Sequence, residues 1–152
     1  MAESNIERTL VLVKPDGVRR GLMGEVLARF ERKGFTIVAA RMLSISRSTA
    51  EAHYAEHQGK PFYGELVAFI TSAPVLALAV EGRSAIATVR AMVGATDPLK
   101  AAAGTIRGDY AVATSSNIIH ASDSPASAAR ELALFFQASD FVRYSRTGAE
   151  YL

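Results

Sequence analysis

The sequence contains no cysteine among its 152 residues. This absence excludes a disulfide scaffold, a thiol nucleophile, cysteine-ligated zinc and iron–sulfur clusters. Charge of one sign is also scarce, because 17 Lys and Arg face 15 Asp and Glu and leave a formal net charge of +2. A surplus this small, with basic residues scattered along the chain, does not indicate binding to nucleic acid.

Long hydrophobic runs and targeting signals are missing as well. The longest apolar stretch, Leu66–Val80, is interrupted by two polar residues and by Pro74, and it is too short to span a bilayer. Met1–Thr9 is polar and lacks the apolar segment of a signal peptide. We therefore expect a cytoplasmic protein that does not enter a membrane.

Several nucleotide-binding and catalytic motifs are absent too. The chain has no P-loop, no G-x-G-x-x-G, no G-x-S-x-G and none of the paired motifs of protein kinases. If the protein handles nucleotides, it does so without a P-loop, a dinucleotide fold or a protein-kinase cleft.

The composition that remains is that of an ordinary globular protein, with 49% hydrophobic and 21% charged residues. The length suits one domain, and the chain has no repeat, linker or low-complexity tract. We expect a single domain over residues 1–152.

Hydrophobic patterns predict four strands separated by helices. The strands are expected at residues 9–13, 35–45, 75–80 and 117–120, and the helices at about 22–33, 48–57, 65–71, 84–93 and from 125 onward. Ser48 or Thr49 is expected to cap the second helix, and Ser124 the last. Residues 94–116 are expected to be irregular, and a loop of that length is usually functional. This order predicts a ferredoxin-like α+β sandwich, a four-stranded antiparallel sheet covered by helices.

His53 and His57 fit the H-x-x-E-H pattern of inverted zinc peptidases. On a continuous helix the two imidazoles would share one face. The pattern has only three fixed positions and a peptidase needs a third, distant ligand, so we favour ordinary helix residues over a zinc site.

His120 stands at the end of a short apolar strand, just before an expected helix N-terminus that suits bound anions. Glu131 follows eleven residues later, about two turns into that helix. If the helix packs back on the strand, the carboxylate fixes the imidazole tautomer and leaves the other ring nitrogen as a nucleophile. The alternative is a core histidine whose only role is to satisfy Glu131.

Three cations could neutralise the phosphates of a nucleotide: Lys14 beside a turn, Arg90 on a helix, and Arg107 between Gly104 and Gly108. Each by itself could equally be a solvated surface charge. Phe62 follows a Gly-Lys-Pro turn and by itself would be a loop residue that packs into the core.

Taken together, these segments resemble the nucleoside diphosphate kinase family. They occur in the order of the family from about Glu7 to the C-terminus, and they are Val13–Val18 with Gly21, Tyr54–His57 with Lys60–Phe62, Gly94–Pro98, Gly104–Asp109 and Asn117–Ser124. Several long motifs in register are far more specific than any one of them.

The resemblance implies a mechanism and a role for each candidate. His120 would take the γ-phosphate from ATP and pass it to a nucleoside diphosphate, with Glu131 holding its ring. Lys14 and Asn117 would bind the sugar hydroxyls and poise the leaving oxygen, and Tyr54 would lie beside the transferred phosphoryl group. The remaining candidates would bind phosphates or, in the case of Phe62, stack on the base; the phosphate ligands would be Arg90, Thr96 and Arg107.

The resemblance also implies partners. Mg²⁺ would arrive on the nucleotide phosphates, so no metal-binding residue is assigned on the protein. The family forms homo-oligomers, hexamers or in some bacteria tetramers, in which the loop around Pro98 contributes to subunit contacts. The expected fold is again the ferredoxin-like sandwich.

The chain departs from the family pattern at three places. Ala121 stands where glycine is usual, Ala103 where proline is usual, and Thr114–Ser116 where an apolar residue, glycine and arginine are common. If position 121 needs a positive φ or a close approach of the backbone, its methyl group would strain the turn beside the nucleophile. A nucleotide-binding module without activity is therefore the alternative to an enzyme.

Overall fold

A four-stranded antiparallel sheet forms the centre of the computed structural model, which describes residues 5–152. Its strands are β1 (Ile6–Val13), β2 (Thr36–Leu43), β3 (Val75–Arg83) and β4 (Ile119–Ala121), in the spatial order β2-β3-β1-β4. β1 pairs with both β3 and β4, so the first strand of the chain lies inside the sheet and the last strand forms one of its edges. The predicted ferredoxin-like α+β fold is confirmed.

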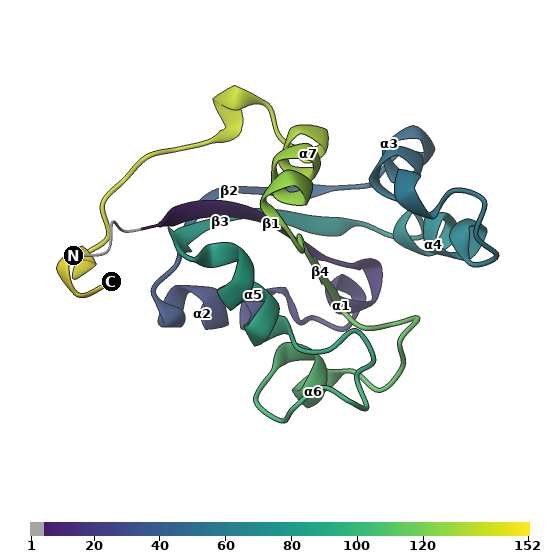
Figure 1. The fold of residues 1–152 in the computed structure, drawn as a ribbon, viewed down its shortest axis with the longest axis horizontal. Helices are drawn as coiled ribbons and strands as arrows, with labels where there is room; N and C mark the ends of the chain where they lie inside the picture. The colour runs from purple at the N-terminus through teal and green to yellow at the C-terminus, as the bar shows by residue number, and fades with distance from the viewer. Residues whose placement is uncertain (1–4) are drawn as a thin grey trace.

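Helices cover both faces of the sheet (Figure 1). One face carries α2 (Met23–Lys33) and α5 (Ala85–Val93), with the short α1 (Pro15–Arg19) and α6 (Ile106–Tyr110) beside them. The other face carries α3 (Arg47–His53), α4 (Tyr63–Ile70) and α7 (Pro125–Phe135). Single 3₁₀ turns lie at Ala55–His57, Ala138–Asp140 and Ala149–Tyr151. Within residues 5–152, no helix combines the length and apolarity needed to cross a membrane.

The central strand β1 is buried on both faces, which explains its unbroken apolar run. Leu10 and Leu12 point to the apolar cluster under α3, α4 and α7, whereas Val11 and Val13 point to the cluster under α2 and α5. Side chains of a strand alternate between faces, so a strand between two helical layers must be apolar at every position.

Helix ends follow local chemistry. Gly34 ends α2 in a left-handed conformation at φ 108°, and the Ser124 hydroxyl accepts a hydrogen bond from Ser127 N at 3.1 Å at the start of α7, as predicted. The predicted cap of α3 was wrong. Ser46, not Ser48 or Thr49, accepts the capping hydrogen bond, from Thr49 N.

Two further expectations are corrected. α3 ends at His53, and His57 lies in a separate 3₁₀ turn, so the two histidines do not share the face of one helix. Residues 94–116 are not wholly irregular either, because they contain α6, whose N-cap Thr105 accepts a hydrogen bond from Gly108 N at 3.0 Å. A side chain at Gly108 would meet the Ala102 carbonyl oxygen, so the approach of the two segments requires glycine there.

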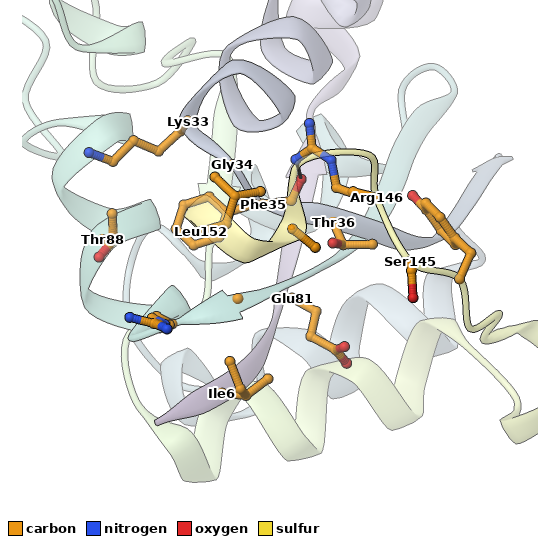
Figure 2. A pocket seen from close by; sticks show the side chains of 14 residues that line it. Ile6, Lys33, Gly34, Phe35, Thr36, Glu81, Thr88, Ser145, Arg146 and Leu152 are labelled. Atoms are coloured by element: carbon orange, nitrogen blue, oxygen red, sulfur yellow. Dashed lines mark hydrogen bonds between the residues drawn. The ribbon is translucent and has the colours of Figure 1, made fainter. Parts of the chain in front are cut away.

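The C-terminal segment, residues 142–152, runs past the edge of the sheet and contacts the end of α2 (Figure 2). Arg146 donates hydrogen bonds to the carbonyl oxygens of Phe35 at 2.6 Å and Glu31 at 2.9 Å. Leu152 lies over Gly34, where any Cβ would collide with it. A cavity of about 460 Å³ lies between this segment and the sheet.

Candidate active site

A cavity of about 770 Å³ lies between the β4 end of the sheet and the segment around α4. The predicted substrate-binding and nucleophilic residues line it together, although they come from segments far apart in the chain; they are Lys14, Tyr54, Phe62, Arg90, Thr96, Arg107, Asn117 and His120. None of them lines the C-terminal cavity. Glu131 lies behind His120 on α7, as the sequence predicted.

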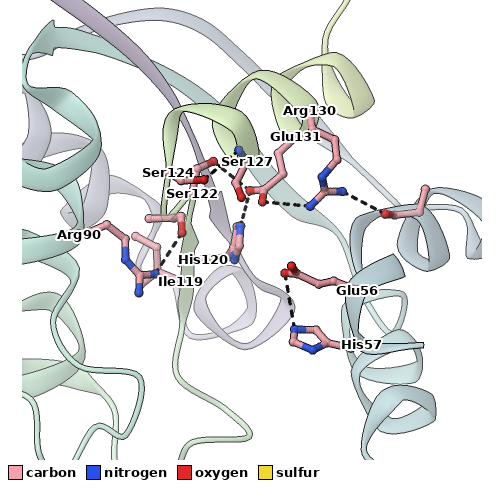
Figure 3. Close-up of polar contacts among 12 residues, drawn as sticks. Glu56, His57, Arg90, Ile119, His120, Ser122, Ser124, Ser127, Arg130 and Glu131 are labelled. Atoms are coloured by element: carbon pink, nitrogen blue, oxygen red, sulfur yellow. Dashed lines mark hydrogen bonds and ion pairs between the residues drawn. The ribbon is translucent and has the colours of Figure 1, made fainter. Parts of the chain in front are cut away.

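His120 lies on β4 with its ring directed at α7 (Figure 3). Its Nε2 is 2.6 Å from Oε1 of Glu131. Since a carboxylate can only accept, Nε2 carries the proton and Nδ1 holds the lone pair. Among residues 5–152 nothing hydrogen-bonds to Nδ1, and the ring lines the cavity. This arrangement leaves one nucleophilic nitrogen available to a ligand.

Glu131 is almost fully buried, with 4% of its surface exposed. Burial raises its pKa, but the hydrogen bonds that it accepts from His120 and from Ser122 help to bring the pKa below its ordinary value. The carboxylate is therefore ionised and orients the imidazole.

Tyr54 is buried just after α3 and lines the cavity beside His120. Burial, assisted by the negative charge of Glu131, raises the pKa of Tyr54 to about 12. Its hydroxyl stays protonated at neutral pH and can donate a hydrogen bond to an anionic ligand.

Lys14 follows β1 and is 9% exposed, and its ammonium group donates to Oδ1 of Asn117. Burial lowers its pKa to about 8, Asp16 opposes this shift, and the positive charge of Arg107 adds to it. Asn117 in turn donates to the carbonyl oxygen of Thr96 at 3.0 Å. Lys14 and Asn117 are thus fixed as a pair before any ligand binds.

Arg107 is 4% exposed, and its guanidinium both hydrogen-bonds to the protein backbone and lines the cavity. It donates to the carbonyl oxygens of Gly94 at 3.1 Å, Asn117 at 3.4 Å and Ile119 at 2.6 Å. A guanidinium has five N–H donors, so two remain for a ligand. Burial and the nearby Arg90 lower the pKa of Arg107 to about 10, which still leaves it charged at neutral pH.

Arg90 lies at the side of the cavity, where it donates to the Ala121 carbonyl oxygen at 3.1 Å. Thr96 is exposed on the segment after α5, which leaves its hydroxyl accessible. With Lys14 and Arg107, the cavity therefore has three cations in its wall, as the sequence predicted.

Phe62 lies at the far end of the cavity and is 44% exposed, so it is not the core residue of the alternative interpretation. Its ring lies 5.5 Å from that of His57. Thr114, Ser115 and Ser116 also line the cavity and give it a short polar wall.

Ile118, rather than Ala121, carries the unusual backbone at this site. Ile118 has φ 74°, although β-branched residues strongly disfavour positive φ, and Ile119 N donates to the Asn117 carbonyl oxygen at 2.8 Å. Ala121 is an ordinary β4 residue paired with Val11, and it is not among the residues with positive φ. Position 121 therefore does not need a positive φ, and its methyl group causes no strain of that kind.

The roles of Ser122, Asp16 and His53 were not foreseen. The Ser122 hydroxyl donates to Oε1 of Glu131 at 2.9 Å, and Oδ2 of Asp16 accepts from Ile118 N at 2.9 Å, which holds the strained turn in place. The alternation of a strand could have indicated Ser122, since residues two apart share a face. Burial lowers the pKa of His53, which packs against His120, to about 3.

Comparison with known proteins agrees with this geometry. Residues 7–141 match the family model described as nucleoside diphosphate kinase. The chain belongs to the nucleoside diphosphate kinase family. It is an enzyme that transfers the γ-phosphate of a nucleoside triphosphate to a nucleoside diphosphate.

Relatives in this family are similar over nearly their full length. The chain is 58% identical to a nucleoside diphosphate kinase of Pelotomaculum thermopropionicum over 91% of this chain and 93% of the relative. A structure of the Halobacterium salinarum enzyme in complex with CDP has a TM-score of 0.93 and 47% identity, covering 95% of this chain and 97% of that one. A transition-state mimic of the Borrelia burgdorferi enzyme with vanadate and ADP has a TM-score of 0.89 and 39% identity, covering 95% of each chain.

Proposed function

We propose that Nδ1 of His120 carries the phosphoryl group between the two nucleotides. In the first half-reaction a bond forms from Nδ1 to the γ-phosphorus of ATP, while the bond from that phosphorus to the bridging oxygen breaks and ADP leaves. In the second half-reaction the β-phosphate oxygen of another nucleoside diphosphate attacks the phosphohistidine and restores the free imidazole. Two similar half-reactions give ping-pong kinetics.

The contact between His120 and Glu131 is the observation that carries this proposal. The 2.6 Å distance commits Nε2 to the carboxylate, so the lone pair belongs to the nitrogen on the cavity side. No separate base is needed, because the proton lies on Nε2 and the attacking Nδ1 already holds its lone pair. When phosphorus bonds to Nδ1 the ring gains positive charge, and the buried carboxylate of Glu131 stabilises it.

The cations and Tyr54 would stabilise the phosphates. Phosphoryl transfer depends mainly on positioned charge, and the two free N–H groups of Arg107, the guanidinium of Arg90 and the ammonium of Lys14 supply it. Tyr54, whose raised pKa keeps its proton, would donate beside the transferred group. Thr96 would add a hydroxyl to the phosphate ligands.

The far end of the cavity would hold the nucleoside. The exposed ring of Phe62 would stack on the base, and Lys14 with Asn117 would bind the sugar hydroxyls. Stacking discriminates weakly among bases, because every base has a π-face. The substrates would therefore be ATP and nucleoside diphosphates of several bases.

Mg²⁺ would enter as part of the nucleotide substrate. Mg²⁺ prefers a few carboxylates together with phosphate oxygens and water. The single carboxylate that lines the described cavity is Glu65, while Glu131 lies behind His120 and does not line it. This donor set favours a metal held by the phosphates.

A homo-oligomer completes the proposal, as a hexamer or a tetramer. Leu99 is 78% exposed, in the loop around Pro98 that the family resemblance assigns to subunit contacts. Light scattering during gel filtration would count the subunits. We also propose one domain over residues 1–152, since a single sheet serves both apolar clusters, and a cytoplasmic location, which cell fractionation would test.

His120→Ala tests the central step. We expect transfer from Mg-ATP to GDP to fall to background, and the acid-labile label from γ-labelled ATP to disappear from the protein, because the nucleophile is gone. His57→Ala is the matched control, since it removes another imidazole that lines the cavity. Undiminished transfer or labelling in His120→Ala would contradict the proposal.

A further inference from the structure

His53 is a buried imidazole without hydrogen bonds. It ends α3 and is 3% exposed, and neither of its ring nitrogens has a partner among residues 5–152. Buried polar groups are nearly always hydrogen-bonded, and leaving one unsatisfied costs about 1–3 kcal/mol. A histidine at this position therefore calls for a partner that the rest of the described chain does not supply.

The position of His53 relative to the reacting group suggests that partner. Its ring centre lies 4.7 Å from that of His120 with the planes at 84°, so the two rings meet edge to face. His53, His120 and Glu131 each offer one ligand atom, and these three atoms lie within 4.8 Å of one another. Tyr54 and Phe135 pack on the remaining sides of His53.

Two imidazoles and one carboxylate form a donor set that suits zinc. Zn²⁺ binds His nitrogen and carboxylate oxygen at about 2.0–2.2 Å, and His₂Glu is one of its known ligand sets. The three donors already lie within 4.8 Å of one another, so side-chain adjustments without a change of fold would bring them around one ion. Ser122 already donates to Glu131 and would orient this carboxylate from outside the metal shell. Mg²⁺ prefers oxygen donors and would not compete well here.

We propose that His53, His120 and Glu131 form an inhibitory Zn²⁺ site behind the nucleophile. The metal would take the place of the proton between His120 Nε2 and Glu131 Oε1. A neutral imidazole with a metal on Nε2 carries its proton on Nδ1, so the displaced proton moves to the nitrogen that faces the cavity. The lone pair on that nitrogen is then lost, although the cations that bind phosphate are untouched.

Metal binding can be measured separately from activity. Zn²⁺ titrated into nucleotide-free protein against a chromogenic chelator should show one site per chain, and Co²⁺ should give the visible absorption of a four-coordinate ion. His53→Phe preserves the aromatic packing against Tyr54 and Phe135 and should weaken binding at least about 10-fold, since one ligand is lost. His57→Phe, which alters the other histidine of the H-x-x-E-H pattern, should bind as the unmodified chain does.

Two results would overturn the site: no Zn²⁺ binding below millimolar concentration, or equal affinity in His53→Phe. Circular dichroism and thermal unfolding check that His53→Phe folds, and His53→Gln replaces it if it does not. Loss of binding in His57→Phe as well as in His53→Phe would assign zinc to the sequence pattern and contradict the cluster.

Inhibition is the second part of the proposal and rests on His120 as the nucleophile. Transfer from Mg-ATP to GDP is followed with free Zn²⁺ fixed by a metal buffer, and each variant is compared with itself without zinc. We expect inhibition of the unmodified chain that EDTA reverses and saturating nucleotide does not relieve, and resistance in His53→Phe. If zinc binds and phosphoryl transfer stays at its full rate, the inhibition is contradicted but the metal site is not. The role of His120 as the nucleophile is tested separately by His120→Ala.

Discussion

The two ends of the catalytic cavity are built in different ways. At the end proposed to bind the phosphates, which we call the phosphate end, charged side chains are buried and hydrogen-bonded; Glu131 and Arg107 are each 4% exposed. At the end proposed to bind the nucleoside, which we call the nucleoside end, Phe62 is 44% exposed and lines the cavity together with the short side chains of Thr114–Ser116. One end is rigid before substrate binds, and the other is open.

This difference follows from what each end must recognise. Phosphate charge is common to every substrate and has to be met at fixed positions during transfer, so pre-oriented donors are favoured there. The base differs from substrate to substrate, and an exposed aromatic ring accepts any of them. Substitutions at the phosphate end should therefore reduce the rate, and those at the nucleoside end should reduce affinity.

Glu131→Gln should have the largest effect among the supporting residues. The neutral amide cannot hold the imidazole tautomer or stabilise the charge that forms on His120, so we expect kcat to fall on the order of 10²-fold with little change in KM. Steady-state kinetics measure both constants. Glu65→Gln, which removes a carboxylate from the cavity edge, is the control and should leave kcat nearly unchanged. A large rise in KM with normal kcat would contradict the conclusion that the phosphate end determines the rate and the nucleoside end the affinity.

The pH dependence should report Lys14. Its pKa of about 8 in the free protein means that its charge is lost as the pH rises through 8, so kcat/KM should fall towards tenfold per pH unit above that value. Bound phosphates favour the charged ammonium, so kcat should begin to fall at a higher pH. Lys14→Met should lack this limb of the kcat/KM profile, and an unchanged profile would contradict the assignment.

Stability should change in the opposite direction over the same range. The pKa of Lys14 falls from 10.5 in the unfolded chain to about 8 in the folded one, so the unfolded chain binds more protons between these values. The free energy of unfolding should therefore rise between pH 8 and 10.5, by up to about 3 kcal/mol from this group. Denaturant unfolding of the unmodified chain and of Lys14→Met isolates the contribution, and equal pH slopes would count against it.

Phe62→Ala should have a smaller effect, at the nucleoside end. Stacking of a base on an aromatic ring contributes about 1–3 kcal/mol, so we expect KM for the nucleotide to rise about fivefold or more while kcat changes little. The rise should be similar for adenine and guanine nucleotides, and Phe62→Tyr should restore affinity. A loss of affinity for nucleotides of one base only would show that this end of the cavity hydrogen-bonds to the edge of the base as well as stacking on its face.

Ala121→Gly should have the smallest effect. The residue has an ordinary strand conformation and only its carbonyl oxygen contacts Arg90, so glycine should leave kcat and KM unchanged. The added backbone freedom should lower the free energy of unfolding by about 0.5–1 kcal/mol. A marked gain in rate would restore the interpretation of alanine as a sign of decay.

The sequence predicts the site best where neighbouring elements fix the geometry. The contact between His120 and Glu131 follows from a strand and the next helix packing on it, so spacing alone was sufficient. The same reasoning failed for His53 and His57, because it assumed a helix that continues past residue 53. A local pattern does not show where a helix ends when tertiary contacts decide it.

Contacts between distant segments were beyond prediction. The partners of Arg107 are carbonyl oxygens on two separate segments, at Gly94 and at Asn117 and Ile119, and no side-chain pattern encodes a carbonyl. The left-handed conformation of Ile118 likewise contradicts its residue type, since it depends on Asp16 rather than on neighbouring residues. Burial of His53 depends on packing between α3 and β4 and has no signal of its own.

The hydrogen bond from Ile118 N to Asp16 spans 102 positions, and β1 pairs with β4 across a similarly long stretch of the chain, as in the pair Leu12 and His120. During synthesis, the residues of this cavity that come from the N-terminal half of the chain therefore lack their partners until β4, near the end of the chain, has been translated. A truncated chain has no partial version of the catalytic apparatus, so phosphoryl transfer becomes a property only of molecules that have closed the sheet.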